Sequence, residues 1–491
     1  MDHKHPVVSA SVGYVASDLR WWQPVLLGAL AGGMGWGIRG QYGHETGAMI
    51  AGLLMSLVLA HLFRPHAVTL PVARAVAWCT VAIGFGGSMT YGQTIGLTQD
   101  GPLIGNWAAL AWGMLGLAIK GGIWIGFAGV FLGMGLSGRQ YRPLELLLLM
   151  AGLLVLFVLG TSLLNAPFDP ANKILPRIYF SDDWRWEPEA ALKPRREVWG
   201  GLLLALLGLV LDVAVRKRDA LARNLGLWAV LAGALGFPLG QSLQAAHAWN
   251  REAFATGTWA SVDPLVNWWN LMEITFGATA GAGLGRGLWL NRRRLGELRA
   301  AERGAIAPLV GWGLLALHAS LLVAVEFGKW PVVDAVYDTG LVAGIIPVVA
   351  IAGTRWWPCA LALPITVLPI AGKTLVALAY AEPTVGRVPG WITCVLIPLA
   401  LTAWAAAWWS RDPRPLQPSH RFTRFTLVLA TWLYFSLNFA RFDFPWPWAA
   451  WTQRTPSALV FLACAVGLTV VALALPVQGR SGRTGALAPG S

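Results

Sequence analysis

Apolar residues form long runs along almost the whole chain, and short polar segments separate them. A transmembrane helix needs about 20 consecutive, mostly apolar residues to cross the hydrocarbon core of a bilayer. We therefore expect an all-α, polytopic integral membrane protein. The runs predict about fourteen spans, at residues 22–38, 44–62, 75–93, 106–136, 144–164, 199–215, 225–246, 267–290, 307–327, 338–353, 358–380, 390–409, 425–440 and 456–475.

Glycine interrupts these runs at places where a helix could end or unwind. The run at 106–136 is too long for one straight span, and Lys120-Gly121-Gly122 could break it. Glycine followed by a polar residue lets a helix present backbone and side-chain groups to a cavity. Such pairs recur at Gly40-Gln41, Gly92-Gln93, Gly160-Thr161, Gly240-Gln241, Gly328-Lys329 and Gly372-Lys373.

Composition agrees with a membrane protein. The 491 residues are 56% hydrophobic and 12% charged, whereas soluble domains carry roughly 25% charged residues. We predict one transmembrane domain at 22–475, between polar tails at 1–21 and 476–491. The long connection at 165–198 is large enough to cap a site, although it could equally be a plain surface loop.

Positive charge predicts the orientation of the chain. Along alternate connections, twenty-two Lys and Arg residues fall on one side and twelve on the other. The positive-inside rule then places both termini in the cytoplasm, in a cell membrane that we take to be a bacterial inner membrane. The formal net charge of +13 is explained by topology signals and contacts with membrane lipids. Nothing in its pattern indicates a nucleic-acid partner.

The sequence offers little support for disulfides, metals or known enzyme motifs. The cysteines lie inside apolar runs without metal-site spacing, so we expect small buried side chains and no cofactor. No G-x-S-x-G, H-E-x-x-H or P-loop pattern is present. The four cysteines are Cys79, Cys359, Cys394 and Cys464.

The segment "WGIRGQYGHETGA" at 36–48 places several polar side chains between the first two spans. The planar guanidinium of Arg39 suits a carboxylate or a phosphate, and Gln41 stands beside it. The alternative is an internal salt bridge from Arg39 to Glu45. His44 could relay a proton, or it could be a hydrogen-bonded structural residue.

An acid followed by small residues recurs in three segments: "ETGAMIAG" from Glu45, "EITFGATAG" from Glu273 and "DTGLVAG" from Asp338. The segments "NWAALAWGMLG" at 106–116 and "NWWNLMEITFG" at 267–277 also align. These similarities predict parallel hairpin repeats, although a chain rich in Gly, Ala, Leu and Trp produces chance matches. We expect Arg39, His44 and the three acids to line one outward-facing cavity.

Other ionisable residues are supporting candidates, because a charge inside a span is costly and usually faces a partner or water. Lys120, near the middle of its run, is a candidate for substrate binding. Glu326 and Lys329 have the spacing of a local ion pair. The remaining supporting candidates are Asp334, Lys373, Asn438, Arg441 and Asp443.

These features favour two main functions. The first is a permease in which Glu45, Glu273 and Asp338 form a proton or cation site and Arg39 binds a small polar or anionic solute. The second is an outward-facing acyl- or glycosyltransferase for a lipid-linked or glycan substrate, with His44 as general base and Glu45 orienting it. A structural subunit would explain the packing but not the costly charges. The sequence does not decide the oligomeric state.

Overall fold

The computed structural model describes residues 19–43, 45–298, 305–328, 330–381, 385–441 and 451–474. These residues include most of each predicted span. The candidates His44, Lys329 and Asp443 lie outside them, and so do the side chains of Glu45, Glu326 and Arg441.

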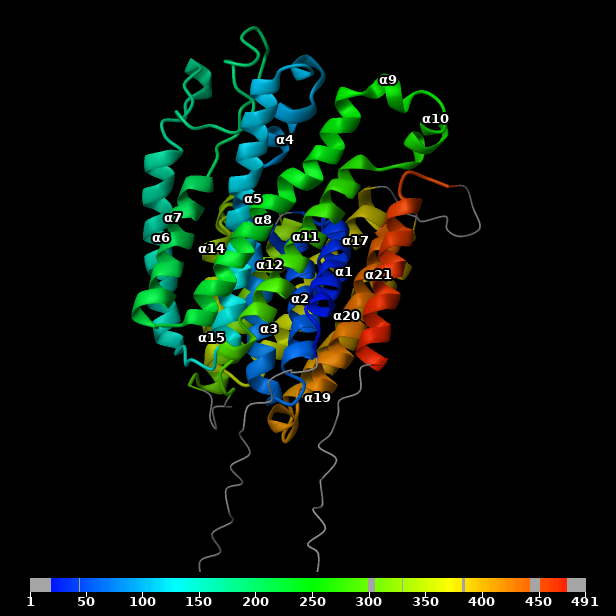
Figure 1. Ribbon diagram of the computed structural model, residues 1–491. Helices are drawn as coiled ribbons and strands as arrows, with labels where there is room; N and C mark the ends of the chain where they lie inside the picture. Colours follow the sequence, from blue (N-terminus) through cyan, green and yellow to red (C-terminus); the bar gives the residue numbers. More distant parts are fainter. Residues whose placement is uncertain are drawn as a thin grey trace, which may run out of the picture.

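The described residues form helices and contain no β-strand, as the hydrophobic runs predicted (Figure 1). Among the described residues, nine helices are long and apolar enough to cross a membrane, and one bent pair would make a tenth. The chain is therefore a multi-pass helical membrane protein, while the count of fourteen spans stays a prediction. The main helices are α1 (Trp22–Arg39), α2 (Glu45–Phe63), α3 (Thr69–Gly84), α5 (Trp107–Leu136), α6 (Pro143–Leu164), α7 (Trp199–Leu211), α8 (Ala220–Trp249), α11 (Trp268–Leu290), α12 (Pro308–Val323), α17 (Thr366–Val376), α19 (Ile397–Ser410), α20 (His420–Arg441) and α21 (Thr455–Ala474).

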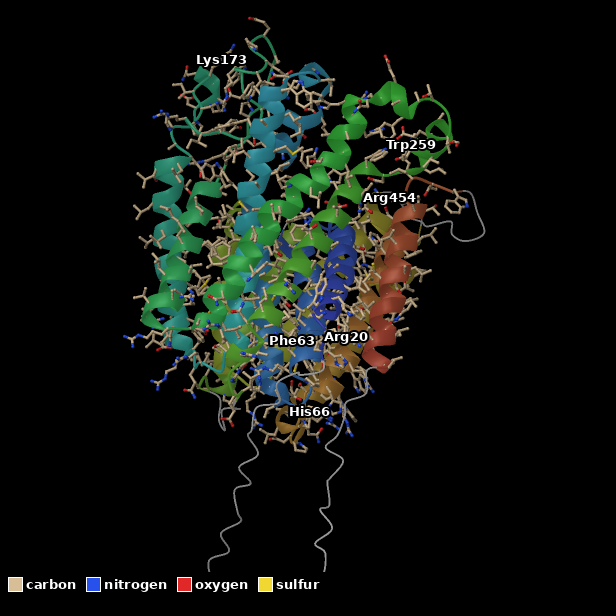
Figure 2. The ribbon with its side chains drawn as sticks, in the orientation of Figure 1. Arg20, Phe63, His66, Lys173, Trp259 and Arg454 are labelled. Carbon is tan, nitrogen blue, oxygen red and sulfur yellow. The ribbon has the colours of Figure 1, made fainter. Side chains whose placement is uncertain are left out.

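The two ends of the molecule carry different connections. Figure 2 shows Arg20, Phe63 and His66 at one end and Lys173 and Trp259 at the other. We call the first the inner end and the second the outer end, after the orientation that the positive-inside rule predicts. The short helices α9 (Arg251–Phe254) and α10 (Trp259–Val262) lie at the outer end (Figure 1).

The predicted break at Lys120-Gly121-Gly122 is wrong, because α5 runs unbroken for 30 residues. The glycines serve packing instead. A Cβ added to Gly121 would lie 2.4 Å from the carbonyl oxygen of Gly233 in α8, and one added to Gly133 would lie 2.4 Å from the Cα of Ala222. Backbones approach this closely only where side chains are missing. Gly160, Gly240 and Gly372 likewise lie inside helices rather than at their ends.

Two other predicted runs are not straight spans. The run at 338–353 is helical from Gly340 to Gly353 and is long enough to span only together with the preceding helix α13 (Pro331–Asp338), from which an 87° bend at Thr339 separates it. The run at 75–93 is divided: α3 ends at Gly84, and the 3₁₀ turn η1 (Phe85–Ser88) follows it. After three residues without helix, the short helix α4 (Gly92–Gln99) begins.

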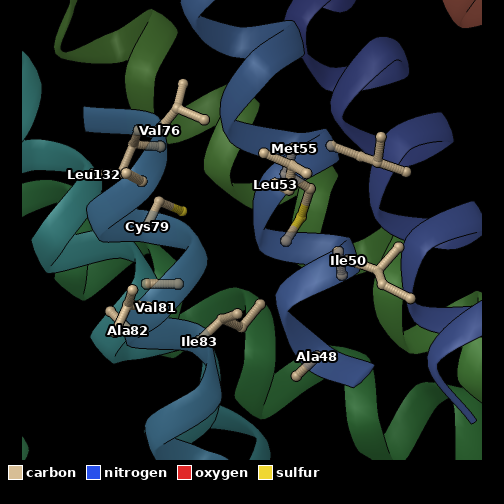
Figure 3. Close-up of a cluster of buried hydrophobic side chains, with 14 of the residues drawn as sticks. Ala48, Ile50, Leu53, Met55, Val76, Cys79, Val81, Ala82, Ile83 and Leu132 are labelled. Atoms are coloured by element: carbon tan, nitrogen blue, oxygen red, sulfur yellow. The ribbon is translucent and has the colours of Figure 1, made fainter. Parts of the chain in front are cut away.

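Four helices form the frame of the molecule, in the packing order α5, α8, α11 and α1. The contacts of α1 with α11 join Gly28 to Gly281 and Gly32 to Gly277, so the two helices run antiparallel. Helices α5 and α11 both pack antiparallel to α8 and therefore run in the same direction. Figure 3 shows part of the apolar core, with buried side chains of the neighbouring helices α2 and α3.

Helices α5 and α11 begin alike, as the aligned segments suggested. Each follows an asparagine whose side chain accepts a hydrogen bond from the backbone N–H three residues later. The backbone angles are close: φ −84° and ψ 87° at Asn106, φ −84° and ψ 92° at Asn267. Descent of the two helices from a duplicated hairpin stays a prediction.

Candidate functional site

The central feature of the site is an ion pair between two helices that meet through glycine. Arg39 is the last residue of α1, and its Nη1 lies 3.1 Å from Oε1 of Glu273 in α11. The two side chains are 2% and 1% exposed. Gly40 packs directly against the Glu273 carboxylate, where a Cβ would lie within 1.9 Å of Oε2. The close approach of α1 and α11 therefore brings the charges together.

Tyr91 completes the hydrogen-bonding around this ion pair. Arg39 donates to the Tyr91 hydroxyl at 2.7 Å, and that hydroxyl lies 3.5 Å from Oε1 of Glu273. Tyr91 stands in the irregular segment between η1 and α4, where its φ is −133°. The interruption of the helix after Ser88 thus places a hydroxyl beside the ion pair.

Three aromatic rings surround the guanidinium of Arg39. Its Cζ lies 5.2 Å from the ring centroids of Trp36 and Tyr91 and 5.0 Å from that of Trp124. Cations within about 6 Å of such rings are stabilised by cation–π attraction. We call Arg39, Glu273, Tyr91, Trp36 and Trp124 the Arg39 cluster.

Lys120 has a protein partner for each of its three donors, although the sequence suggested substrate binding. Its Nζ lies 2.6 Å from the carbonyl oxygen of Thr90, from Oγ1 of Thr94 and from Oε1 of Glu197. Both charged side chains are 1% exposed. Glu197 also accepts from the backbone N–H of Phe180 at 3.0 Å. This second ion pair fastens the long 165–198 connection to the helix bundle.

Residues 165–198 lie over the outer ends of α4 and α5. Trp112 donates to the carbonyl oxygen of Tyr179 at 2.7 Å, and Gln93 donates to that of Lys193 at 2.9 Å. Partial burial, with the negative charges of Asp100 and Glu187 nearby, raises the pKa of Asp182 in this connection to about 6. The connection is thus a docked cover rather than a free loop.

A narrow pocket of about 20 Å³ lies between the outer parts of α1, α11, α20 and α21. That volume has room for about one water molecule. Its polar lining includes the predicted candidates Gln41 and Asn438, together with Asn270 and Arg454. Asn270 donates to the carbonyl oxygen of Gly37 at 2.8 Å and stands one turn before Glu273. The pocket therefore reaches the neighbourhood of the buried acid, and Arg454 lies toward the outer end (Figure 2).

Asp338 lies apart from the Arg39 cluster. It is exposed at the end of α13, and no hydrogen bond or ion pair among the described residues joins it to Arg39 or Glu273. Its charged neighbours are Asp334 and Lys373. Lys373 reaches the first hairpin turn, where it donates to the carbonyl oxygen of Tyr42 at 2.5 Å. A single cavity shared by Glu45, Glu273 and Asp338 stays a prediction, since the side chain of Glu45 is not described.

The sequence did not single out Glu197, Tyr91 or Trp124. Glu197 could have been recognised, because it is an acid directly before the apolar run at 199–215. It therefore lies at the same end of the molecule as the first half of α5, which carries Lys120. Trp124 had no such signal, since a single functional tryptophan does not stand out among 28. Tyr91 had none, because its position depends on the interruption of the helix after Ser88.

Metal chemistry has no ready site in the described part of the chain, where no group of three or more His, Cys, Asp and Glu is placed to hold an ion. The four cysteines are buried and free. Comparison with protein-family models, with curated protein sequences and with solved structures gives no match.

Proposed function

We propose that this protein is a permease for a small anionic or polar solute and that the Arg39 cluster is its coupling and binding site. The observation that supports this most directly is the buried Arg39–Glu273 ion pair, enclosed by aromatic rings beside an interrupted helix. Ionisable residues within membrane helices are costly, and they commonly mark substrate, ion or proton pathways.

Because the aromatic rings also stabilise Arg39, the site can exist with Glu273 either ionised or protonated. In one state, Glu273 is ionised and neutralises Arg39. In the other, Glu273 takes up a proton, and the three rings together with the Tyr91 hydroxyl still stabilise the guanidinium. The charge of Arg39 can then bind a carboxylate or phosphate group of the solute. Proton uptake by Glu273 and solute binding by Arg39 are thereby coupled.

The surrounding elements suit such a cycle. Interrupted helices with irregular backbone commonly form the binding sites of transporters, and the segment between η1 and α4 supplies Tyr91 to one ion pair and Thr90 to the other. The narrow pocket beside Asn270 has room for about one water molecule, so it would have to widen for water or protons to reach Glu273 from the outer end. In the conformation described, the ion pair is closed off from solvent.

The proposal can be tested with the purified chain in liposomes that contain a pH-sensitive dye. Solutes are screened as a panel of small carboxylates, inorganic anions and neutral polar compounds. We expect at least one anion to drive proton flux, and Glu273→Gln to abolish that flux while the protein stays folded. Glu145→Gln is the control. Glu145 is a partly exposed acid that pairs with Lys217 at 2.6 Å and lies outside the Arg39 cluster.

Equal flux in Glu273→Gln and the parent chain would refute the coupling role. Loss of folding in Glu273→Gln, with no flux in the parent for any solute, would instead indicate a structural ion pair. The transferase hypothesis depends on His44 and the side chain of Glu45, so we do not propose it.

A further inference from the structure

A cleft lies at the inner end, away from the Arg39 cluster. It has a volume of about 580 Å³, within the range of small-molecule sites. Its walls come from α3, from the connection between α5 and α6, and from residues 297–298. Arg64, which follows the labelled Phe63 at the inner end of Figure 2, donates to the carbonyl oxygens of Leu136 and Gly296 beside the cleft.

The described lining is basic. It contains the three arginines Arg74, Arg139 and Arg142 and a single acid, Glu297. Arg74 is committed to the protein, since it donates to the carbonyl oxygens of Ile351 and Thr354. Residues Arg139 and Arg142 are exposed, and the ion pairs among the described residues include neither of them. The guanidinium groups of Arg139 and Arg142 are therefore available to a ligand in the cleft.

The turn that carries these arginines is held in place. Asp219 accepts a hydrogen bond from Ser137 at 2.6 Å and from Tyr141 at 2.8 Å. Gly138, with φ +77°, and Gly296 let the turn and the segment at 296–298 touch through their backbones. A fixed turn presents its arginines in one geometry, which reduces the entropy lost when a ligand binds.

The rim of the cleft continues onto an apolar surface. Pro143, the first residue of α6, lines the cleft, and only 22% of the apolar part of α6 is buried. Exposed leucines follow immediately, with Leu144 65%, Leu147 43% and Leu148 65% accessible. A ligand with a phosphate and acyl chains would fit both surfaces, whereas a free phosphate would use the arginines alone.

We propose that this cleft is a binding site for the phosphate group of an anionic phospholipid, held by Arg139 and Arg142, with the acyl chains along α6. Basic pockets between helices on the cytoplasmic side recognise such headgroups, and guanidinium groups contact phosphate through paired hydrogen bonds. This inference does not depend on the proposed transport function.

Native mass spectrometry of the detergent-solubilised full chain, titrated with phosphatidylglycerol or phosphatidylcholine, tests the site. We expect preferential retention of phosphatidylglycerol and about 30-fold weaker binding in Arg139→Gln/Arg142→Gln, from the usual contribution of each basic residue near a lipid surface. Arg139→Lys/Arg142→Lys should keep most of the preference. The control Arg411→Gln/Arg421→Gln removes two exposed arginines elsewhere at the inner end and should bind normally.

Two results would overturn the proposal. The first is equal phosphatidylglycerol retention by Arg139→Gln/Arg142→Gln and the control pair. The second comes from inorganic pyrophosphate, titrated by calorimetry: if pyrophosphate binding depends on Arg139 and Arg142 while lipid retention does not, the cleft takes a free phosphate. Size-exclusion chromatography of each variant checks that it is folded.

Discussion

Arg39 and Glu273 are stable inside the bundle because each charge has several partners. Charges taken out of water lose several kcal/mol of solvation, and a buried ion pair regains this only with good geometry and additional hydrogen bonds. Tyr91 and the three rings provide these contacts for Arg39. The Glu273 carboxylate is contacted by Trp269 and Asn270 as well as by Arg39, but Arg39 is the one positive charge that pairs with it among the described residues. The two partners therefore depend on each other unequally.

This inequality predicts different costs for the two single substitutions. Arg39→Gln leaves the buried Glu273 carboxylate uncompensated and should destabilise the fold by about 3–5 kcal/mol. Glu273→Gln should cost less, because the rings still stabilise Arg39. The double variant should recover part of the loss. Reversible unfolding in mixed micelles measures all three, as a double-mutant cycle, and strictly additive costs would contradict the pairing.

At the scale of helices, glycine determines which surfaces meet. Where α1 packs on α11, a Cβ added to Gly277 would lie 2.2 Å from the carbonyl oxygen of Gly32. A Cβ on Gly152 in α6 would meet nothing within 4 Å. The same substitution therefore has opposite consequences in the two helices.

We expect Gly277→Ala to destabilise the protein by about 1–3 kcal/mol, the usual cost of overpacking, and to weaken proton flux because it separates Arg39 from Glu273. Gly152→Ala should be neutral or stabilising by up to about 1 kcal/mol, since alanine favours helix. Thermal unfolding and the liposome assay measure the two effects. Unchanged flux and stability in Gly277→Ala would show that the two backbones can separate without consequence.

The cover formed by residues 165–198 should respond to pH through Asp182. Because its pKa rises from 3.8 to about 6 on folding, the folded cover holds a proton that the unfolded chain releases. The associated stabilisation is complete below about pH 3.8 and is lost as the pH rises through about 6. Hydrogen exchange of the cover, corrected for intrinsic rates, should therefore be more protected at pH 4.5 than at pH 7.

Asp182→Asn should remove this pH dependence, whereas Asp169→Asn, in the same connection, should retain it. A cover whose protection is equal at the two pH values in the parent chain would contradict the assignment.

At the scale of the whole molecule, the predicted orientation places the outer end outside the cell and the inner end in the cytoplasm. Figure 2 shows Lys173 and Trp259 at the outer end and His66 at the inner end. Lys173, His66 and Thr258, which precedes Trp259 in the chain, are exposed. The native cysteines of the described residues are buried, so labelling background should be low. A membrane-impermeant maleimide should label Thr258→Cys and Lys173→Cys in intact cells but not His66→Cys. The reverse pattern would invert the orientation.

The long apolar runs predicted the helical class and most helix positions, because a segment that crosses the hydrocarbon core of a bilayer must be apolar along its length. It could not predict partners. Lys120 was recognised as a costly charge, but its contact with Glu197 depends on where a distant connection docks. Glycines in α5 looked like a break since the same residue permits unwinding or close packing, and the facing helix α8 decides between them. The bend at Thr339 joins two helical segments, and the composition of the chain there does not indicate the angle between them.

The lengths of α5 and α8 have a practical consequence for imaging. Each contains 30 residues and so extends for about 45 Å, whereas the hydrocarbon core is about 30 Å thick. With the residues 165–198 cover and α9–α10 gathered at one end (Figure 1), the particle projects asymmetrically from a detergent micelle. Electron micrographs of single particles should therefore contain a landmark that fixes their orientation without a bound antibody fragment.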